Sequence, residues 1–299
     1  MLPVLHVGFH KCGSTTLQGA LFANHPQIAN LGEPREDPTA LEAISGIWKS
    51  CDANPRKRRD FDLDRSRGLW QQALAKIAPG KVPVFSKETL TLSDFYAEPG
   101  DDRIPKRLRS VVGPAKIIIV VRHQIRLVES LFLFHAKGFR YEAAEQWLSS
   151  RSDDLRLYRY HVMVNSFVEH FGRENVAVFL FEELKADAAA FARQICKFIG
   201  VDAETGAALI RGERRNRRVS QRYLLYSKLR RGLGMYFQFG RMVPGPLRQA
   251  FNNFVMAGAE AKVQLPRNWV TKLEQSFRDD NRRLAQEWGL PLGKYDYPL

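Results

Sequence analysis

Near its start the chain reads Val4-Leu5-His6-Val7-Gly8-Phe9-His10-Lys11-Cys12-Gly13-Ser14-Thr15-Thr16-Leu17. Apolar residues typical of a buried strand run into a turn bounded by Gly8 and Gly13, and a helix is predicted from Ser14. Such a turn can expose successive backbone N–H groups, and the helix adds the positive end of its dipole at the same point. The stretch therefore predicts a phosphate-binding loop. The alternative is a strand-to-helix turn that binds no ligand.

The spacing of the two glycines is that of a nucleoside-triphosphate loop, but one residue differs. Ser14 stands where such loops carry lysine, and the lysine is Lys11, inside the turn. A lysine at that place would contact the terminal group of an anion rather than a β/γ-phosphate pair. The loop therefore favours a phosphate or phosphosulfate donor other than Mg-ATP.

A second segment has the same order of strand, charged turn and helix. Residues 117–121 are all Ile or Val, Arg122 follows, and helical apolar spacing continues to His135. Arg122 is expected at the carboxyl end of its strand, where open α/β sheets bind ligands, and Ser130 about two turns up the helix. An arginine fork with a hydroxyl suits an isolated phosphate. The alternative is that Arg122 caps a strand and Ser130 is an ordinary surface residue.

Together these two segments resemble the sulfotransferases that use 3′-phosphoadenosine 5′-phosphosulfate (PAPS). The loop with Lys11 is similar to their 5′-phosphosulfate loop, and Arg122 with Ser130 to their 3′-phosphate element, including the eight-residue interval. Gln124 stands where many relatives have proline, as in a bacterial-looking branch. Residues 214–220 resemble a segment that closes over the donor, and residues 277–285 resemble the terminal helix of bacterial members.

The resemblance implies a PAPS site without a metal ion. Lys11 would stabilise the sulfonate and the leaving nucleotide, while amides and hydroxyls of residues 13–16 hold the 5′-phosphate, in a reaction comparable to phosphoryl transfer. The expected donor-binding residues are His10, Lys11, Cys12, Gly13, Ser14, Thr15, Thr16, Arg122, Ser130, Arg217 and Arg218.

The acceptor hydroxyl needs a base, and two carboxylates are candidates. Glu33 follows the second expected strand, 22 residues after Lys11, a position similar to the catalytic glutamate of heparan-type sulfotransferases. Glu88 ends the third expected strand, and Lys87 before it resembles a substrate-side lysine of that group. His10 and His123 are bases by chemistry, but each adjoins a donor-binding residue. A surface salt bridge is the alternative role for Glu33.

The composition describes a globular chain. It has 299 residues, 44% of them hydrophobic and 26% charged, which suits one α/β domain over residues 1–299. There is no run of about 18 apolar residues, and Met1-Leu2-Pro3 leads directly into the first strand, so we expect a cytoplasmic protein. The three cysteines lack C-x-x-C spacing, which supports neither a disulfide framework nor a zinc site.

A formal net charge of +14 attracts anionic partners of several kinds. No helix-turn-helix, zinc-finger or aromatic RNA-binding pattern is present, so we do not expect nucleic acid as the physiological partner. We expect a carbohydrate or glycolipid acceptor. For the basic and aromatic stretch 221–254 there are two interpretations, peripheral contact with an anionic membrane and ordinary helices packed on the core. The alternatives are a P-loop kinase of a small metabolite and a non-catalytic polyanion-binding protein on a transferase scaffold.

Strand-like and helical stretches alternate along the chain. Strands are expected at 3–8, 27–31, 82–86, 116–121 and 175–180, which predicts a three-layer parallel sheet with helices on both faces, of the P-loop nucleotide-binding type. Residues 35–66 are expected as a surface excursion. Residues 201–265, broken by Gly and Pro, are expected as a less regular cover or acceptor-side region.

Overall fold

The computed structural model divides the chain into two compact units, which we describe separately. The sheet unit comprises Met1–Gln124, Asp153–Arg215 and Ser276–Leu299, and the helical unit comprises Ile125–Ser152 and Asn216–Gln275. The structure describes residues 1–32, 37–52, 54–91, 96–137, 143–211, 220–232 and 245–299. The predicted single domain over residues 1–299 stays a prediction.

The sheet unit is built on five parallel strands in the order β2-β3-β1-β4-β5. The strands are β1 (Val4–His6), β2 (Ile28–Asn30), β3 (Val82–Ser86), β4 (Lys116–Val121) and β5 (Val176–Leu180). At the centre, Leu5 pairs with Phe85 on one side and with Ile117 on the other. Residues 117–121 are fully buried, as their unbroken apolar run predicts for a sheet covered on both faces.

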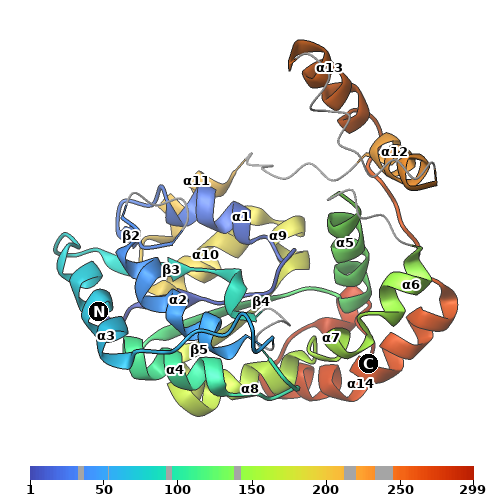
Figure 1. Ribbon diagram of the computed structural model, residues 1–299. Coiled ribbons are helices and arrows are strands. Elements are labelled where there is room, and N and C mark those ends of the chain that lie inside the picture. Colours follow the sequence, from blue (N-terminus) through green and yellow to red (C-terminus); the bar gives the residue numbers. More distant parts are fainter. Residues whose placement is uncertain (33–36, 53, 92–95, 138–142, 212–219, 233–244) are drawn as a thin grey trace. The chain divides into compact units, whose positions relative to one another are not determined.

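Helices cover both faces of this sheet (Figure 1). From β1 the chain crosses to the edge strand β2, and from there it moves back across the sheet through β3 to β4 and β5. Because right-handed crossovers that run in opposite directions lie on opposite faces, the connecting helices cover both faces. One face carries α1 (Ser14–Thr16), η1 (Leu17–Phe22), α10 (Ala188–Ile199) and α11 (Ala203–Ile210); the other carries α2 (Thr39–Cys51), α3 (Leu63–Ala75), α4 (Arg103–Val112) and α8 (Tyr160–Phe171). The predicted three-layer α/β fold is confirmed.

Shorter elements complete the sheet unit. They are η2 (Glu88–Thr91), α7 (Ser152–Arg156), η4 (Arg173–Asn175), α9 (Phe181–Ala186) and η6 (Leu292–Tyr295). The second half of α14 (Arg267–Trp288) also belongs to it. There the Asp280 carboxylate accepts hydrogen bonds from the backbone N–H groups of His161 and Val162, at 2.9 and 3.2 Å. This carboxylate caps the start of α8.

The surface excursion expected at 35–66 is wrong for residues 39–51, which form α2. Ala43, Ile44, Ile47 and Trp48 of this helix are buried. Their spacing of three and four residues is that of one helix face. The charged and proline-containing residues on either side had obscured this pattern.

The helical unit contains most of α5 (Gln124–Lys137) together with α6 (Ala144–Ser149), α12 (Gln221–Gly232), α13 (Gly245–Met256) and the start of α14. Phe132 and Trp147 pack edge to face, with ring centroids 5.5 Å apart. The expected irregular stretch 201–265 thus includes regular helices. Among the described residues, no helix is both long and apolar enough to cross a bilayer.

Candidate active site

The Gly8–Gly13 loop connects β1 to α1 through an unusual backbone. Lys11 and Gly13 both have positive φ, 62° and 86°. The backbone conformation of Gly13 favours glycine, and a Cβ there would lie 2.5 Å from Leu184 Cδ2, so that the leucine side chain would have to shift. The Gly13 carbonyl accepts hydrogen bonds from the N–H groups of Thr16 and Leu17, at 3.0 and 3.2 Å. Left-handed residues followed at once by a helix start form a backbone turn of the anion-binding kind.

Behind this loop lies a partly buried network of polar side chains. The Ser14 hydroxyl donates to Glu88 Oε1 at 3.1 Å, and Gln18 Nε2 donates to Glu88 Oε2 at 3.0 Å. Gln18 Nε2 also donates to Ser86 Oγ at 3.1 Å, and His6 Nδ1 lies 2.7 Å from the same oxygen. The network joins the ends of β1 and β3 to the first turns of α1 and η1. It therefore holds the helix start against the sheet.

The network contains an ionised carboxylate and a neutral imidazole. Burial acts to raise the pKa of Glu88, but its own backbone N–H, the nearby His10 and His6, and the Gln18 amide outweigh burial and lower that pKa. Burial lowers the pKa of His6 to about 4, against the attraction of Glu88. Near neutral pH, Glu88 thus accepts hydrogen bonds as an anion while His6 carries no charge.

Arg122 ties the end of β4 to the loop. It is buried, and its Nη1 donates to the Lys11 carbonyl at 2.9 Å. Its guanidinium carbon lies 4.8 Å from the centroid of the Phe181 ring, and its own carbonyl accepts a hydrogen bond from Tyr160 at 2.7 Å. Phe181 also flanks Gly13. One aromatic ring of α9 therefore supports both the loop and the arginine.

Cys12 is a packed thiol within the loop. Its Sγ donates to the His10 carbonyl at 3.4 Å, and burial raises its pKa against the opposing charge of Arg122. The thiol therefore stays protonated. If Cys12 contacts an anion, it does so through its backbone N–H and not through its thiol.

The turn after Arg122 is held by the buried carboxylate of Glu182. Glu182 Oε1 accepts from the His123 N–H at 3.2 Å, and Glu182 Oε2 accepts from the Tyr297 hydroxyl at 2.9 Å. His123 Nε2 lies 2.8 Å from the Asp296 carbonyl, and its ring packs 5.3 Å from that of Tyr297. These contacts support a structural role for His123 rather than one as a base.

The other residues expected at the site are distributed as follows. His10, Lys11 and Thr16 are half-buried and Thr15 is exposed, all at the turn or the start of α1. Lys87 is half-buried, and its N–H donates to the His6 carbonyl at 3.0 Å. The sheet unit therefore brings the Gly8–Gly13 loop, Lys87, Glu88 and Arg122 together at the carboxyl ends of β1, β3 and β4.

The roles expected for four further site residues stay predictions. Ser130 is half-buried on α5, in the helical unit, so its pairing with Arg122 stays a prediction. Glu33, Arg217 and Arg218 lie outside the described residues. Their expected roles stay predictions as well.

Sequence reasoning missed the residues that support the site. These are Gln18, Ser86, Tyr160, Glu182 and Tyr297. Only Gln18 carried a signal, as the one polar side chain in the apolar run Leu17–Phe22. The other partners lie 38 or more residues away from the groups that they contact, where no local pattern can indicate them.

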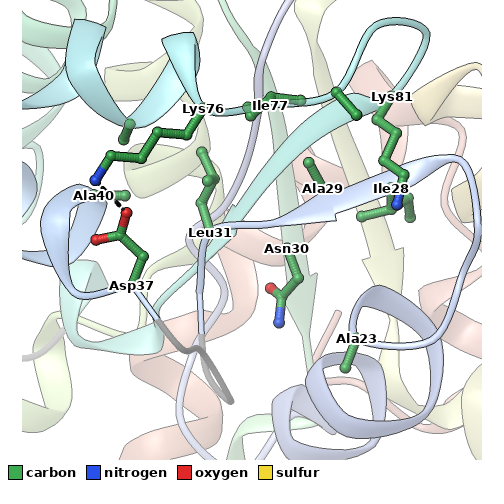
Figure 2. A pocket seen from close by; sticks show the side chains of 12 residues that line it. Ala23, Ile28, Ala29, Asn30, Leu31, Asp37, Ala40, Lys76, Ile77 and Lys81 are labelled. Carbon is green, nitrogen blue, oxygen red and sulfur yellow. Dashed lines mark hydrogen bonds and ion pairs between the residues drawn. The ribbon is translucent and has the colours of Figure 1, made fainter.

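A pocket of about 520 Å³ lies elsewhere, along β2 and between the start of α2 and the end of α3 (Figure 2). Alanines and other aliphatic side chains make up much of its lining, and Lys76 at its rim forms an ion pair with Asp37 at 2.6 Å. No residue of the Gly8–Gly13 loop lines it. Within the described part of the chain, no three His, Cys, Asp or Glu side chains gather as a metal site requires.

Comparison with known proteins agrees with this geometry. The pattern of the sulfotransferase family matches residues 3–205. A sulfotransferase from Alicyclobacillus acidocaldarius is similar at 19% identity over 68% of this chain and 83% of that chain, with a TM-score of 0.50, and this likeness shows the fold. No curated protein matches.

Two further solved structures are more distant. A sulfotransferase domain from the curacin biosynthetic pathway has 16% identity over 71% of this chain and 79% of that chain, with a TM-score of 0.44. Mouse sulfotransferase SULT7A1, complexed with PAP, has 17% identity over 67% and 58%, with a TM-score of 0.38. Since the family pattern alone spans 203 of 299 residues and includes the loop, Glu88 and Arg122, we conclude that this chain belongs to the sulfotransferase family and is an enzyme of sulfonate transfer.

Proposed function

We propose that the enzyme transfers a sulfonate group from PAPS to a hydroxyl of a carbohydrate or glycolipid, as a bacterial carbohydrate-type member of its family. The observation that carries this proposal is the Gly8–Gly13 loop, with its two left-handed residues and the buried Arg122 bonded to the Lys11 carbonyl. This arrangement combines backbone N–H groups, a helix start and two cations. Those are the groups that a phosphosulfate anion needs.

The residues present fit the proposed donor. The N–H groups of Gly13, Ser14, Thr15 and Thr16 would hold the 5′-phosphate, and Lys11 would lie at the transferred group. The Ser14 hydroxyl already donates to Glu88, so its contribution to the phosphate is limited to the backbone N–H. The hydroxyls of Thr15 and Thr16, which are exposed and half-buried, supply the remaining donors.

The proposed reaction is an in-line displacement at sulfur. The bond between sulfur and the phosphate oxygen of PAPS breaks as the acceptor oxygen bonds to sulfur, and the acceptor proton passes to a base. The products are adenosine 3′,5′-bisphosphate and a sulfate ester. Lys11 stabilises the charge that develops on the leaving phosphate and on the sulfonate oxygens. No metal ion has a role in this proposal.

For the base we propose Glu33 rather than Glu88. Both oxygens of Glu88 accept hydrogen bonds and its pKa is lowered, which makes it a weak proton acceptor. Glu88 is better suited to position Ser14 and Gln18. Lys87, on the same turn, would face the acceptor, and His10 beside Lys11 would orient the donor.

At the other end of the donor, Arg122 and Ser130 would bind the 3′-phosphate, with Arg217 and Arg218 closing over it. Arg122 also holds the loop, so Arg122→Ala should weaken adenosine 5′-phosphate as well as adenosine 3′,5′-bisphosphate. Ser130→Ala should weaken only the bisphosphate, by about 0.5–1.5 kcal/mol. Equal losses for both nucleotides in Ser130→Ala would contradict its assignment.

For the place of action we propose the cytoplasm, with peripheral contact to the inner face of the membrane. The basic and aromatic stretch 221–254 supports this contact. An enzyme on the membrane surface would be close to an acceptor that is a membrane-bound glycolipid. Nucleic acid is not proposed as a partner.

The donor is tested by thermal unfolding. A ligand that binds only the folded state raises the melting temperature, so adenosine 3′,5′-bisphosphate should stabilise the protein and ATP with Mg²⁺ should not. The reverse result would favour a kinase.

A panel of hydroxylated acceptors with labelled PAPS then tests the transfer, and Glu33→Gln should lose transfer while keeping its response to the bisphosphate. Transfer to none of them, with binding of polyanions retained, would favour a non-catalytic protein.

A further inference from the structure

The helical unit carries a group of exposed apolar side chains on two adjacent helices. On α12, Leu225 and Leu229 are 58% and 56% exposed. On α13, Leu247, Phe251 and Phe254 are 64%, 45% and 62% exposed. The two leucines of α12 are four residues apart, and the three residues of α13 are four and three residues apart. These spacings put each set on one side of its helix. Large apolar side chains gathered in this way mark an interaction surface.

These side chains are exposed although both helices are otherwise well supported. Tyr223 of α12 and Val255 of α13 are nevertheless buried together in one apolar cluster. The Ser220 hydroxyl caps α12 by accepting from the Tyr223 N–H at 3.0 Å, and it donates to the Val255 carbonyl. The pair of helices, which we call the α12–α13 hairpin, therefore has its own small core in addition to its exposed apolar side chains.

The two helices contact each other through members of the exposed set of α13. The Tyr226 and Phe251 rings pack edge to face, with centroids 5.2 Å apart. Next to them, the Arg222 guanidinium carbon lies 4.8 Å from the centroid of the Phe254 ring. Helical periodicity places Leu225 and Leu229 between Arg222 and Lys228, both of which are exposed. Cations thus border the apolar side.

The charge of this segment has one sign. Residues 220–259 contain no Asp or Glu, and the first carboxylate after Ser220 is Glu260. Over the same residues there are six cations: Arg222, Lys228, Arg230, Arg231, Arg241 and Arg248. An acid-free cationic segment with an exposed apolar side is complementary to an interface that is negative at its surface and apolar beneath.

We propose that the α12–α13 hairpin docks this enzyme on an anionic lipid bilayer, with Leu225, Leu229, Leu247, Phe251 and Phe254 entering the interface and Arg222 and Lys228 at the headgroups. This inference deepens the membrane contact within the proposed function. A second copy of the chain fits less well, because two acid-free cationic surfaces repel each other. Nucleic acid fits less well because three of the five exposed apolar side chains are leucines, which cannot stack on bases as aromatic rings do.

The test is flotation of the full chain with vesicles of phosphatidylcholine, alone or mixed with phosphatidylglycerol. We expect binding to the mixed vesicles only. Arg222→Gln with Lys228→Gln should lower the vesicle affinity by about fivefold for each charge, while Arg56→Gln with Lys57→Gln, an equal change on an exposed turn of the sheet unit, should not. Leu225→Gln with Leu229→Gln should abolish binding, and Leu2→Gln, 38% exposed in the sheet unit, should leave it intact.

Thermal stabilisation by adenosine 3′,5′-bisphosphate is recorded for every variant, to show that each one is folded. Lack of flotation by a protein that responds to the bisphosphate would overturn the docking proposal alone. Flotation without that response would overturn the proposed donor alone. Equal binding to both kinds of vesicle would contradict the role of the cations. Self-association that Leu225→Gln with Leu229→Gln removes, without flotation, would show a second copy as the occupant.

Discussion

The Gly8–Gly13 loop and the α12–α13 hairpin both carry positive charge, but they hold it differently. At the loop, Arg122 is buried and bonded to a backbone carbonyl, and the Glu88 carboxylate lies behind the turn. On the hairpin, Arg222 and Lys228 are exposed and the segment has no carboxylate. A buried charge needs partners inside the protein, whereas an exposed charge can serve a partner outside it.

The two regions also differ in packing, because the loop is fixed by more elements than the hairpin is. Gly13 packs closely against α9, and the side chains that fix the loop come from β1, β3, α1, η1, η2 and α9. The hairpin is held by one small cluster around Tyr223 and Val255. We therefore expect substitutions at the loop to affect nucleotide binding, transfer and stability. Substitutions on the hairpin should leave nucleotide binding unchanged.

The largest effect is expected for Lys11→Ala. Loss of one preorganised cation at the transferred group should raise the barrier by about 3–4 kcal/mol, which lowers kcat by roughly 100- to 1000-fold. Affinity for the product nucleotide should change much less, and vesicle flotation should not change. The rate of transfer from labelled PAPS measures kcat. The control is Lys49→Ala, which changes an exposed lysine of α2. Near-normal turnover would remove Lys11 from the mechanism.

The next effect concerns acid stability. The pKa of His6 is lowered to about 4 in the folded protein, so between pH 6.5 and 4 the unfolded chain binds a proton that the folded protein does not. As the pH is lowered through that window, the free energy of unfolding should decrease by up to about 3 kcal/mol. Below about pH 4 the folded protein binds the proton too, so this decrease should level off. Residues 220–259 contain no His, Asp or Glu, so the hairpin adds nothing to this slope.

Denaturant unfolding at a series of pH values checks this expectation. His6→Gln should show a shallower fall than the unchanged protein over the same window. An equal fall in both would mean that another group is responsible.

A smaller effect is expected for Glu88→Gln. Glutamine keeps one acceptor but presents an amide to Ser14 or Gln18, so a charged hydrogen bond worth about 1.5–3 kcal/mol is lost at the helix start. Affinity for adenosine 3′,5′-bisphosphate should drop at least tenfold, as measured by calorimetry, while Glu42→Gln, an exposed carboxylate of α2, should have no effect. Unchanged affinity with lost transfer would instead make Glu88 the base.

The smallest effect is expected for Ser220→Ala, which removes the cap of α12. The loss should be about 1 kcal/mol and confined to the hairpin. Amide hydrogen exchange should quicken over residues 221–232, while affinity for adenosine 3′,5′-bisphosphate stays constant. Weaker nucleotide binding in this variant would show that hairpin and loop are coupled, contrary to the difference that we describe.

Much of the sheet unit could be predicted from local patterns. The apolar run at 117–121 and the glycines of the loop indicated a parallel sheet with a phosphate site at its edge, and all five strands lie where they were expected. The pattern of α2 was overlooked among charged neighbours. Residues 212–219 and 233–244 lie outside the described residues, so the roles expected for Arg217, Arg218 and the middle of the stretch 221–254 stay untested predictions.

What the sequence by itself determined was the family, the loop and the positions of the strands along the chain, because periodicity and short motifs are local properties. Only the tertiary structure decided which side chains are partners. It showed that both oxygens of Glu88 are engaged by Ser14 and Gln18, and that Arg122 holds the Lys11 carbonyl. It also showed which leucines of the hairpin remain exposed. Burial and long-range hydrogen bonds depend on how distant segments pack, and a single local pattern carries no record of that.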